Sequence, residues 1–182
     1  MTIGLFGKCG GSAWREPFMQ TYRELGLPYF NPQVENWTPE LADDEAWHLA
    51  HDQLILFPVT DETYAAGSLS ETGFSVLSAL RWDASRFVVV YIAPDVNDVL
   101  KLQNPTAAAD SRRSRQLVRA HLEQAAHPNV FIVKDLHQML DVSLRLFAAL
   151  RFIESARSSD TTDWQSAQSP EEWLGAAQGA AA

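Results

Sequence analysis

The sequence predicts an α/β domain in which a parallel β-sheet is covered by helices on both faces. Short apolar runs alternate along the chain with longer segments whose apolar residues recur every three or four positions. One run, at residues 87–92, is apolar throughout and rich in β-branched and aromatic residues, as is typical of a strand buried on both faces. Strands joined by helices run parallel, because each crossover returns the chain in the same direction.

Five strands are expected from apolar runs that are bounded by turn residues. The first run ends at Gly7, and the second ends at Asn31 and Pro32. Both patterns are those of short buried strands that lead into loops. The expected strands are residues 3–6, 29–30, 53–59, 87–92 and 130–133.

Helices are expected wherever apolar residues fall on one helical face between capping and breaking residues. In the first helix, Trp14, Phe18 and Tyr22 are spaced four apart, Ser12 is expected to cap the start, and Gly26 ends the helix. The expected helices are residues 13–25, 39–51, 68–80, 111–126 and 136–156, with an irregular or weakly helical stretch at 97–110.

Two expectations concern which helical side chains are buried. In the helix at 39–51, Trp47 is a candidate packing residue together with Leu41 and Leu49. The arginine-rich run at 112–119 is expected to form a solvated helix face, which is the ordinary role of such a run.

Five parallel strands fit the flavodoxin-like order better than a longer dinucleotide-binding sheet. We therefore expect a three-layer sandwich over residues 1–157. From 158 to 182 the composition changes to Ser, Thr, Asp, Gln and Ala, which indicates a polar tail. Ser169 to Glu172 resembles a capping box, so one short helix is expected within that tail.

Composition excludes several classes of protein. The 182 residues carry 23 acidic and 14 basic side chains and a net charge of −9, which disfavours a general nucleic-acid binder. A single cysteine excludes an internal disulfide framework and a cysteine-rich zinc site, and the five scattered histidines suggest no metal centre. No apolar run is long enough to span a membrane, and the N-terminus resembles a strand, not a signal peptide. A soluble cytoplasmic protein without a metal or cofactor is expected.

Ligands of open parallel sheets bind outside the carboxyl ends of the strands, so the loops there are searched first. The loop after the first strand is rich in glycine and leads into a helix, an arrangement that lets backbone N–H groups approach an anion. Lys8 or Arg15 could add positive charge. The same pattern is equally consistent with a tight turn that binds nothing. The candidate residues of this loop are Gly7, Cys9, Gly11, Ser12, Trp14 and Arg15.

Two further groups follow the second and third strands. Asn31 offers an amide group and Trp37 a stacking face for a base, although both also suit an ordinary turn with a buried tryptophan. Ser68, Ser70 and Glu71 lie at the start of the next expected helix, where a carboxylate is usually a favourable contact with the helix dipole. In the ligand crevice, however, a carboxylate can attack an anomeric carbon and form a glycosyl-enzyme.

Asp52 is the last candidate, and it lies just before the third strand. It is interpreted as a surface carboxylate, as a helix C-terminal residue or as a ligand for a base or a sugar hydroxyl. Its position near the start of the strand is unfavourable for a ligand contact. Asp61 and Glu62, in the loop after the strand, are better placed.

The order of these motifs is more specific than any one of them. Gly-x-Cys-x-Gly-Ser-x-Trp-Arg follows the first strand, Tyr-Phe-Asn-Pro-x-Val-x-x-Trp spans the second, an Asp opens the third, and Ser-x-x-Glu begins the next helix. Over about residues 4–92 this order resembles the nucleoside 2-deoxyribosyltransferase-like family.

The resemblance implies a flavodoxin-like fold and cleavage of an N-glycosidic bond by a glutamate nucleophile, which is Glu71 in this sequence. It also implies that Asp52 contacts the leaving base and that the protein forms dimers or higher oligomers. The nucleophile motif departs from the Gly-Met-Glu-Leu-Gly type, because Ser70 and Thr72 flank Glu71. This departure leaves the substrate open.

The functional hypothesis is a nucleoside or nucleotide N-glycosidase or transferase. The loop from Gly7 to Arg15 and Asn31 hold the sugar or phosphate, Asp52 positions the base, and Trp14 or Trp37 forms a wall. The main alternative is a module that binds a nucleotide or nucleoside without cleaving it. A phosphate-binding flavoprotein is a weaker third interpretation.

Overall fold

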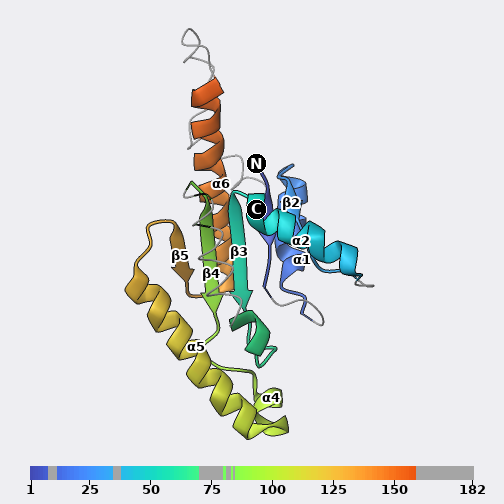
Figure 1. The fold of residues 1–182 in the computed structure, drawn as a ribbon, viewed down its shortest axis with the longest axis vertical. Coiled ribbons are helices and arrows are strands. Elements are labelled where there is room, and N and C mark those ends of the chain that lie inside the picture. Colours follow the sequence, from blue (N-terminus) through green and yellow to red (C-terminus); the bar gives the residue numbers. More distant parts are fainter. Residues whose placement is uncertain (8–11, 35–37, 70–79, 81–82, 84, 159–182) are drawn as a thin grey trace.

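A computed structural model describes residues 1–7, 12–34, 38–69, 80, 83 and 85–158. These residues form a five-stranded, all-parallel sheet with helices on both faces, which confirms the predicted flavodoxin-like α/β sandwich (Figure 1). The strands lie side by side in the order β2-β1-β3-β4-β5. They are β1 Ile3–Leu5, β2 Tyr29–Phe30, β3 Leu54–Val59, β4 Phe87–Ile92 and β5 Val130–Val133.

Five helices have defined bounds, and residues 66–69 are helical as well. α2 has the predicted bounds, with Pro39 in its first turn. α6 projects beyond the amino ends of the strands, whereas α4 lies beyond their carboxyl ends (Figure 1). The helices are α1 Arg15–Glu24, α2 Pro39–His51, α4 Asp98–Gln103, α5 Pro105–Ala125 and α6 Leu136–Ser158.

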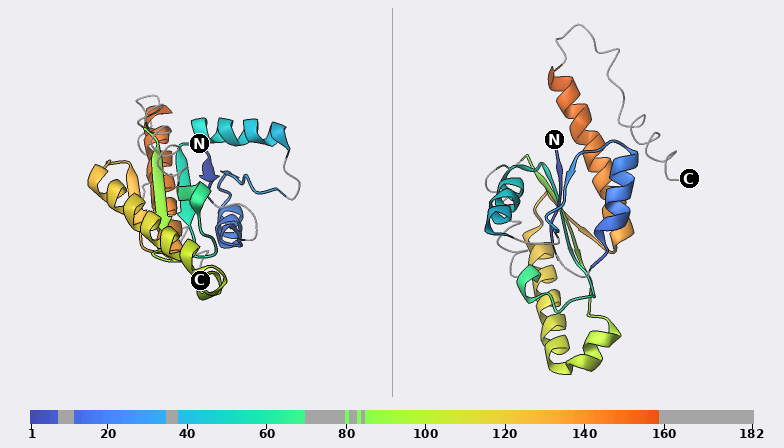
Figure 2. Two further views of the ribbon diagram at one scale, coloured as in Figure 1. Left: turned by 60° about the horizontal axis from the view of Figure 1, so that its bottom comes forward. Right: turned by 90° about the vertical axis from the view of Figure 1, so that its right-hand side faces the viewer.

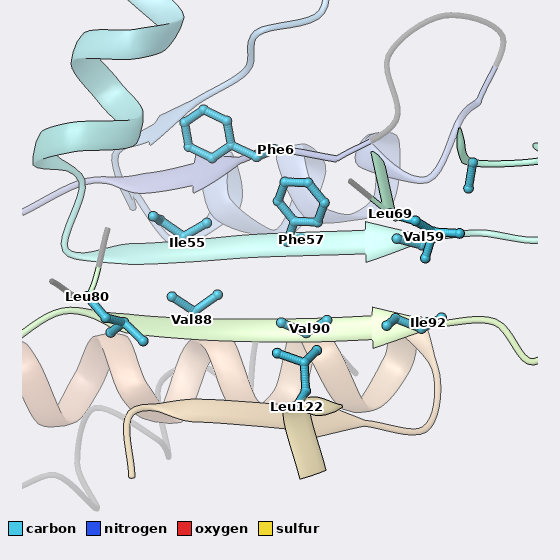
Figure 3. Close-up of a cluster of buried hydrophobic side chains, with 11 residues drawn as sticks. Phe6, Ile55, Phe57, Val59, Leu69, Leu80, Val88, Val90, Ile92 and Leu122 are labelled. Atoms are coloured by element: carbon cyan, nitrogen blue, oxygen red, sulfur yellow. The ribbon is translucent and has the colours of Figure 1, made fainter. Parts of the chain in front are cut away.

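The helices form two layers because alternate side chains of each strand point to opposite faces of the sheet. On one face, Ile55 and Phe57 of β3 pack in a cluster that includes Leu122 of α5 (Figure 3). On the other face, strand residues pack against Phe18 of α1 and Phe147 of α6. The two views in Figure 2 show α2 and α5 on one side of the sheet and α1 and α6 on the other.

The prediction that residues 97–110 are irregular or weakly helical is wrong, because two asparagines start two helices there. The Asn97 side chain accepts the Leu100 N–H at 3.1 Å and caps α4. The Asn104 side chain accepts the Ala107 N–H at 3.0 Å and caps α5, whose first residue is Pro105. Asparagine is a strong N-cap and proline is favoured in the first turn, so α5 begins six residues earlier than expected.

Ser12 does not cap α1, in contrast to the prediction. The helix begins at Arg15, and Trp14 occupies the N-cap position without a side-chain cap bond. The Ser12 hydroxyl instead donates to the Glu62 carboxylate, fifty residues along the chain. A tertiary contact has therefore replaced the local cap.

Each expectation about buried helical side chains needs correction at one residue, although Leu49 packs against the core and Arg112 and Arg119 are exposed as predicted. Trp47 is 55% exposed and stacks on His51 at a ring-centroid distance of 4.5 Å, so it does not pack in the core. Arg115 belongs to the run predicted to be solvated, yet it is only 1% exposed. The long α5 passes the carboxyl ends of β3 and β4, and Arg115 is on the side that faces them.

Smaller differences concern element ends. β3 begins at Leu54, one residue later than expected, and α6 continues to Ser158, two residues further than expected. The short helix expected in the tail lies outside the described residues. None of the helices in the described part of the chain is both long enough and apolar enough to cross a bilayer.

Candidate functional site at the carboxyl ends of the strands

The strand order places a topological switch point between β1 and β3. From β1 the chain moves outward to β2, and it then crosses β1 to form β3 on the other side. In open parallel sheets the loops at such a point diverge and leave a crevice outside the carboxyl ends of the strands. The loops that follow β1 and β3 are therefore the expected walls of a ligand site.

Gly7 brings the loop after β1 close to β3. Its φ angle is +93°, a backbone conformation that residues other than glycine rarely adopt. A Cβ atom at this position would lie 2.6 Å from the carbonyl oxygen of Pro58 in β3. The predicted glycine turn thus has a structural requirement for glycine at its first residue.

Ser12 and Glu62 join the two loops across the switch point. Ser12 is buried, and its hydroxyl donates to Oε2 of Glu62. The Thr60 hydroxyl donates to the same carboxylate oxygen at 3.4 Å. The contact fixes the Glu62 carboxylate beside the segment that leads into α1.

Arg15 joins the loop after β1 to the loop after β2. Its guanidinium donates to the carbonyl oxygens of Leu5 at 2.9 Å and Gly7 at 3.3 Å, and to Oε1 of Gln33 at 3.2 Å. The side chain is 1% exposed and stands over the Trp14 ring, 4.5 Å from its centroid. These contacts direct the positive charge into the protein and brace the two loops.

Arg115 makes an equivalent set of contacts between the ends of β3 and β4. It donates to the carbonyl oxygens of Val59 at 3.2 Å, Ala93 at 3.0 Å, Thr60 at 2.9 Å and Thr63 at 2.6 Å. Burial lowers the pKa of this guanidinium from its usual value, although an arginine stays charged in any protein. Two buried arginines therefore hold the carboxyl edge of the sheet in one geometry.

A cavity of about 400 Å³ opens at this edge. Three of its side chains are carboxylates, and Trp14 and Tyr91 supply aromatic surface. Burial and the charges of Asp61 and Asp135 raise the pKa of the Tyr91 hydroxyl, which therefore keeps its proton at neutral pH. Such a mixture of aromatic surface and hydrogen-bond acceptors suits a ligand with hydroxyl and N–H groups. The lining residues are Trp14, Thr60, Asp61, Glu62, Tyr91, Asp135, Leu136 and His137.

Asn31 follows β2, as predicted, and its amide group stabilises the turn there. Its Oδ1 accepts the Gln33 N–H at 3.0 Å, and its Nδ2 lies 3.5 Å from the Met19 sulfur. Because Gln33 also accepts from Arg15, the turn after β2 is linked to the loop after β1.

Asp52 lies at the amino end of β3, so the structure does not bring it together with Ser12 and Glu62. Its Oδ1 lies 2.9 Å from Nδ1 of His48, and its backbone carbonyl accepts from Nε of Arg86 at 2.6 Å. The His48 ring stacks on Phe30 at a centroid distance of 3.7 Å.

The other oxygen of the Asp52 carboxylate is unusual. Asp52 is only 2% exposed, and its Oδ2 has no hydrogen-bond partner within the described residues. Burial raises the pKa of this carboxyl, while the hydrogen bond and charge of His48 act in the opposite direction. Oδ2 is thus an acceptor that the described part of the protein does not use.

Several predicted site residues cannot be placed. Ser68 is half-buried within the helical residues 66–69. The expected nucleophile Glu71 and its neighbour Ser70 lie outside the residues that the structure describes. The same is true of four candidates in the loops after β1 and β2, which are Lys8, Cys9, Gly11 and Trp37.

Sequence reasoning missed the part of the site that follows β5. Asp135 and His137 line the cavity, and Tyr91 reaches it from β4. The topology contained the signal, since the carboxyl end of β5 meets the same edge of a parallel sheet as the other strands. Within the described ranges, no cluster of three or more His, Cys, Asp or Glu side chains is arranged to hold a metal ion.

Comparisons of the chain with protein-family models, with curated proteins and with solved structures find no match. Function must therefore be inferred from the fold, from the geometry of the carboxyl edge and from the sequence motifs.

Proposed function

We propose that the protein cleaves the N-glycosidic bond of a nucleoside or nucleotide and transfers the ribosyl or deoxyribosyl group to water or to another base. One observation carries the proposal. At the switch point between β1 and β3, the Ser12–Glu62 contact holds the loops after these two strands beside an aromatic, acceptor-rich cavity, and Arg15 links the first of them to the turn after β2. Ser12, Trp14 and Arg15 of the first motif that resembles the deoxyribosyltransferase-like family, and Asn31 of the second, belong to the loops after β1 and β2.

The proposed chemistry is a double displacement. A carboxylate oxygen of Glu71 attacks C1′, the C1′–N bond breaks, and its electron pair leaves with the base, which takes up a proton. Water or the N–H of a second base then attacks C1′, loses a proton and releases the Glu71 carboxylate. The hydrolytic products are one free base and one free pentose.

Other residues bind and orient the substrate in this proposal. The loop from Gly7 to Arg15 and the turn at Asn31 hold the sugar, and Trp14 forms one wall of the cavity. The family resemblance implies a base contact for Asp52, but its carboxylate is buried at the amino end of β3, so the proposal assigns it no contact in the carboxyl-edge cavity.

The direct test is to incubate the protein with a panel of nucleosides, nucleotides and NAD and to measure free base by chromatography. We expect at least one compound to release its base, and we expect Glu71→Gln to abolish the release while circular dichroism shows an unchanged fold. Glu123→Gln, the same change at an exposed glutamate of α5, serves as the matched control. Binding without base release would support the sensor alternative, and full turnover by Glu71→Gln would exclude the mechanism.

We further propose that the protein acts in the cytoplasm as a homodimer or a higher oligomer. The family resemblance supports the oligomer. Light scattering of the purified chain tests it, and a monomer at working concentrations of enzyme would contradict it.

A further inference from the structure

A second cavity lies at the amino ends of the strands, beside the last turns of α6. Its volume is about 680 Å³, which is within the range of ordinary ligand pockets. Leu150 and Ile153 of α6 and Phe87 at the start of β4 give it apolar surface. α6 projects beyond the sheet at this end (Figure 1), and Ile153 is 44% exposed there. The described residues therefore leave part of this apolar surface uncovered.

The rim of this cavity carries a positive charge. Arg157 lines the cavity one turn after Ile153, and it is the only basic side chain among the described lining residues. The one acidic side chain of this lining, Glu154, already forms an ion pair with Arg151 at 3.6 Å. The charge of Arg157 is therefore not balanced by the described lining, and it favours an occupant that carries a carboxylate.

The chain that continues from this rim has the complementary composition. Residues 159–182 follow α6, and they contain four acidic and no basic side chains. Most of the others are Ser, Thr, Gln, Gly and Ala, so Trp164 and Trp173 are exceptions. A tryptophan buries roughly 150–250 Å² when it packs against a protein. Asp163 directly precedes Trp164, so this segment offers a large apolar group beside a negative charge.

The segment is long enough to return to the cavity. α6 ends at Ser158, and a helical rise of about 1.5 Å per residue places Ile153 about 7.5 Å and Leu150 about 12 Å back along the helix axis. The six residues from Ser158 to Trp164 can span up to roughly 20 Å. Trp164 closes a shorter loop than Trp173 does, so its return costs less conformational entropy.

We propose that the segment around Trp164 docks in this cavity of its own chain, with the indole against Ile153 and Phe87 and the Asp163 carboxylate beside Arg157. The docked segment covers the exposed apolar surface at the end of α6 and ties this helix to the amino ends of the strands. The contact does not depend on the proposed catalytic function, because the two cavities lie at opposite ends of the sheet.

The test follows the indole N–H signals of the full chain by NMR, with Trp164→Phe to assign the signal of Trp164. Ile153→Glu places a charge in the cavity. Val99→Glu, the same type of change at a side chain of α4 that is 62% exposed, is the matched control. Solvent access to the indole is measured as the relaxation enhancement by a soluble gadolinium chelate, and free N-acetyltryptophanamide gives the value for full exposure.

We expect the enhancement at Trp164 in the wild type and in Val99→Glu to be about fivefold or more below that of free N-acetyltryptophanamide, because a docked indole meets solvent only when the contact opens. Ile153→Glu should raise the enhancement by about threefold or more, since a buried unpaired charge opposes docking. Full exposure of Trp164 in the wild type, or an enhancement that Ile153→Glu leaves unchanged, would overturn the proposal.

The charge contact is tested at Arg157. Arg157→Gln should raise the enhancement at Trp164 by about twofold, which is the size expected for one exposed ion pair. Arg145→Gln, which removes an ion pair with Asp141 elsewhere on α6, should leave the enhancement unchanged. Equal responses of the two variants would overturn the contact between Asp163 and Arg157.

A mixing experiment identifies which chain the segment occupies. Ile153→Glu labelled with ¹⁵N is unfolded and refolded together with an excess of unlabelled wild type. Docking within one chain predicts that the labelled Trp164 stays exposed, because its own cavity is blocked. Restored protection would show that the segment binds a second copy of the chain, and it would overturn the intramolecular contact.

Discussion

The two ends of the sheet are each stabilised by a buried arginine, but the carboxylates are exposed at the carboxyl end and buried at the amino end. At the carboxyl end, Arg115 binds the carbonyl oxygens of the loops after β3 and β4. At the amino end, Arg86 binds the carbonyl oxygens of Asp52, Ala50 and Leu49 at 2.6 to 2.9 Å. Both arginines are 1% exposed, so each end of the sheet contains a buried guanidinium group that donates hydrogen bonds to backbone carbonyl oxygens.

The carboxylates show the difference. Glu62 and Asp61 are exposed around a cavity at the carboxyl end, whereas Asp52 at the amino end is buried against His48. The amino end also has a larger cavity, of about 680 Å³, whose lining combines apolar side chains such as Phe87 and Ile153 with polar ones such as Arg157. Cavity size alone would therefore favour the amino end, whereas the divergence of loops at the switch point favours the carboxyl end.

The largest expected loss of stability follows the removal of the Arg115 side chain. Arg115→Ala would leave several buried carbonyl oxygens without a donor, so we expect a loss of roughly 3 kcal/mol or more in the free energy of unfolding. Arg119→Ala, on the same helix, removes only an exposed ion pair with Glu123 and should cost less than about 1 kcal/mol. Urea denaturation measures both. Equal effects would mean that the carbonyl contacts contribute little.

The next largest loss of stability is expected at Gly7, where the chain after β1 lies against Pro58 of β3. Gly7→Ala forces a side chain into a left-handed conformation and against the Pro58 carbonyl, and we expect it to lower stability by about 2–3 kcal/mol. Gly67→Ala is the control, because among the residues that the structure describes nothing lies within 4 Å of the added carbon. It should be neutral or slightly stabilising in thermal unfolding. If the two variants melt at the same temperature, the tight turn after β1 is not required.

The buried carboxyl at the amino end should give stability a dependence on pH. The pKa of Asp52 is raised in the folded protein, so the folded state holds this proton up to a higher pH than the unfolded state, whose aspartates titrate near 4. Stability from this group is therefore present at low pH and is lost as pH rises through the folded pKa, by about 1.4 kcal/mol for each unit between the two values.

Asp52→Asn removes this titration. The stability of the wild type minus that of Asp52→Asn should fall as pH rises from about 4 and then become constant. Chemical denaturation at several pH values measures the difference. A difference that rises with pH would show instead that the charged form of Asp52 is the one that the fold stabilises.

The smallest expected effect concerns the contact across the switch point. Ser12→Ala removes the donor to Glu62 and should cost about 1 kcal/mol. In a double-mutant cycle with Glu62→Ala, the coupling energy should be about 0.5–1.5 kcal/mol. Additive effects of the two changes would contradict the link between the loops.

The fold could be predicted from the sequence because its signals are local. Unbroken apolar runs predict β3 and β4, and a proline at the helix start together with the pattern up to residue 51 predicts α2. Most of α5 is predicted as well, but α4 and the first six residues of α5 fall in a stretch predicted to be irregular or weakly helical, although Asn97 and Asn104 are N-caps there.

The site could be predicted only in part, because its key contacts join residues far apart in the chain. The capping preference of serine is a local signal, and it could not indicate that Ser12 would meet Glu62 instead. Similarly, an arginine run is usually solvated, and only the packing of α5 across the strand ends shows that Arg115 is buried. Topology directed the search to the carboxyl edge of the sheet, but the loop after β5, which meets the same edge, was overlooked.

The central claim is that Glu71 forms a covalent bond to the pentose at this edge. The most direct measurement is the intact mass of the protein after incubation with a 2′-deoxy-2′-fluoro nucleoside, because the fluorine slows breakdown of a glycosyl-enzyme by destabilising its oxocarbenium-like transition state. We expect a mass increase of one fluoropentosyl group on the peptide that contains Glu71, and no increase in Glu71→Gln. Base release by the wild type with the pentosyl group on another residue, or undiminished release by Glu71→Gln, would contradict it.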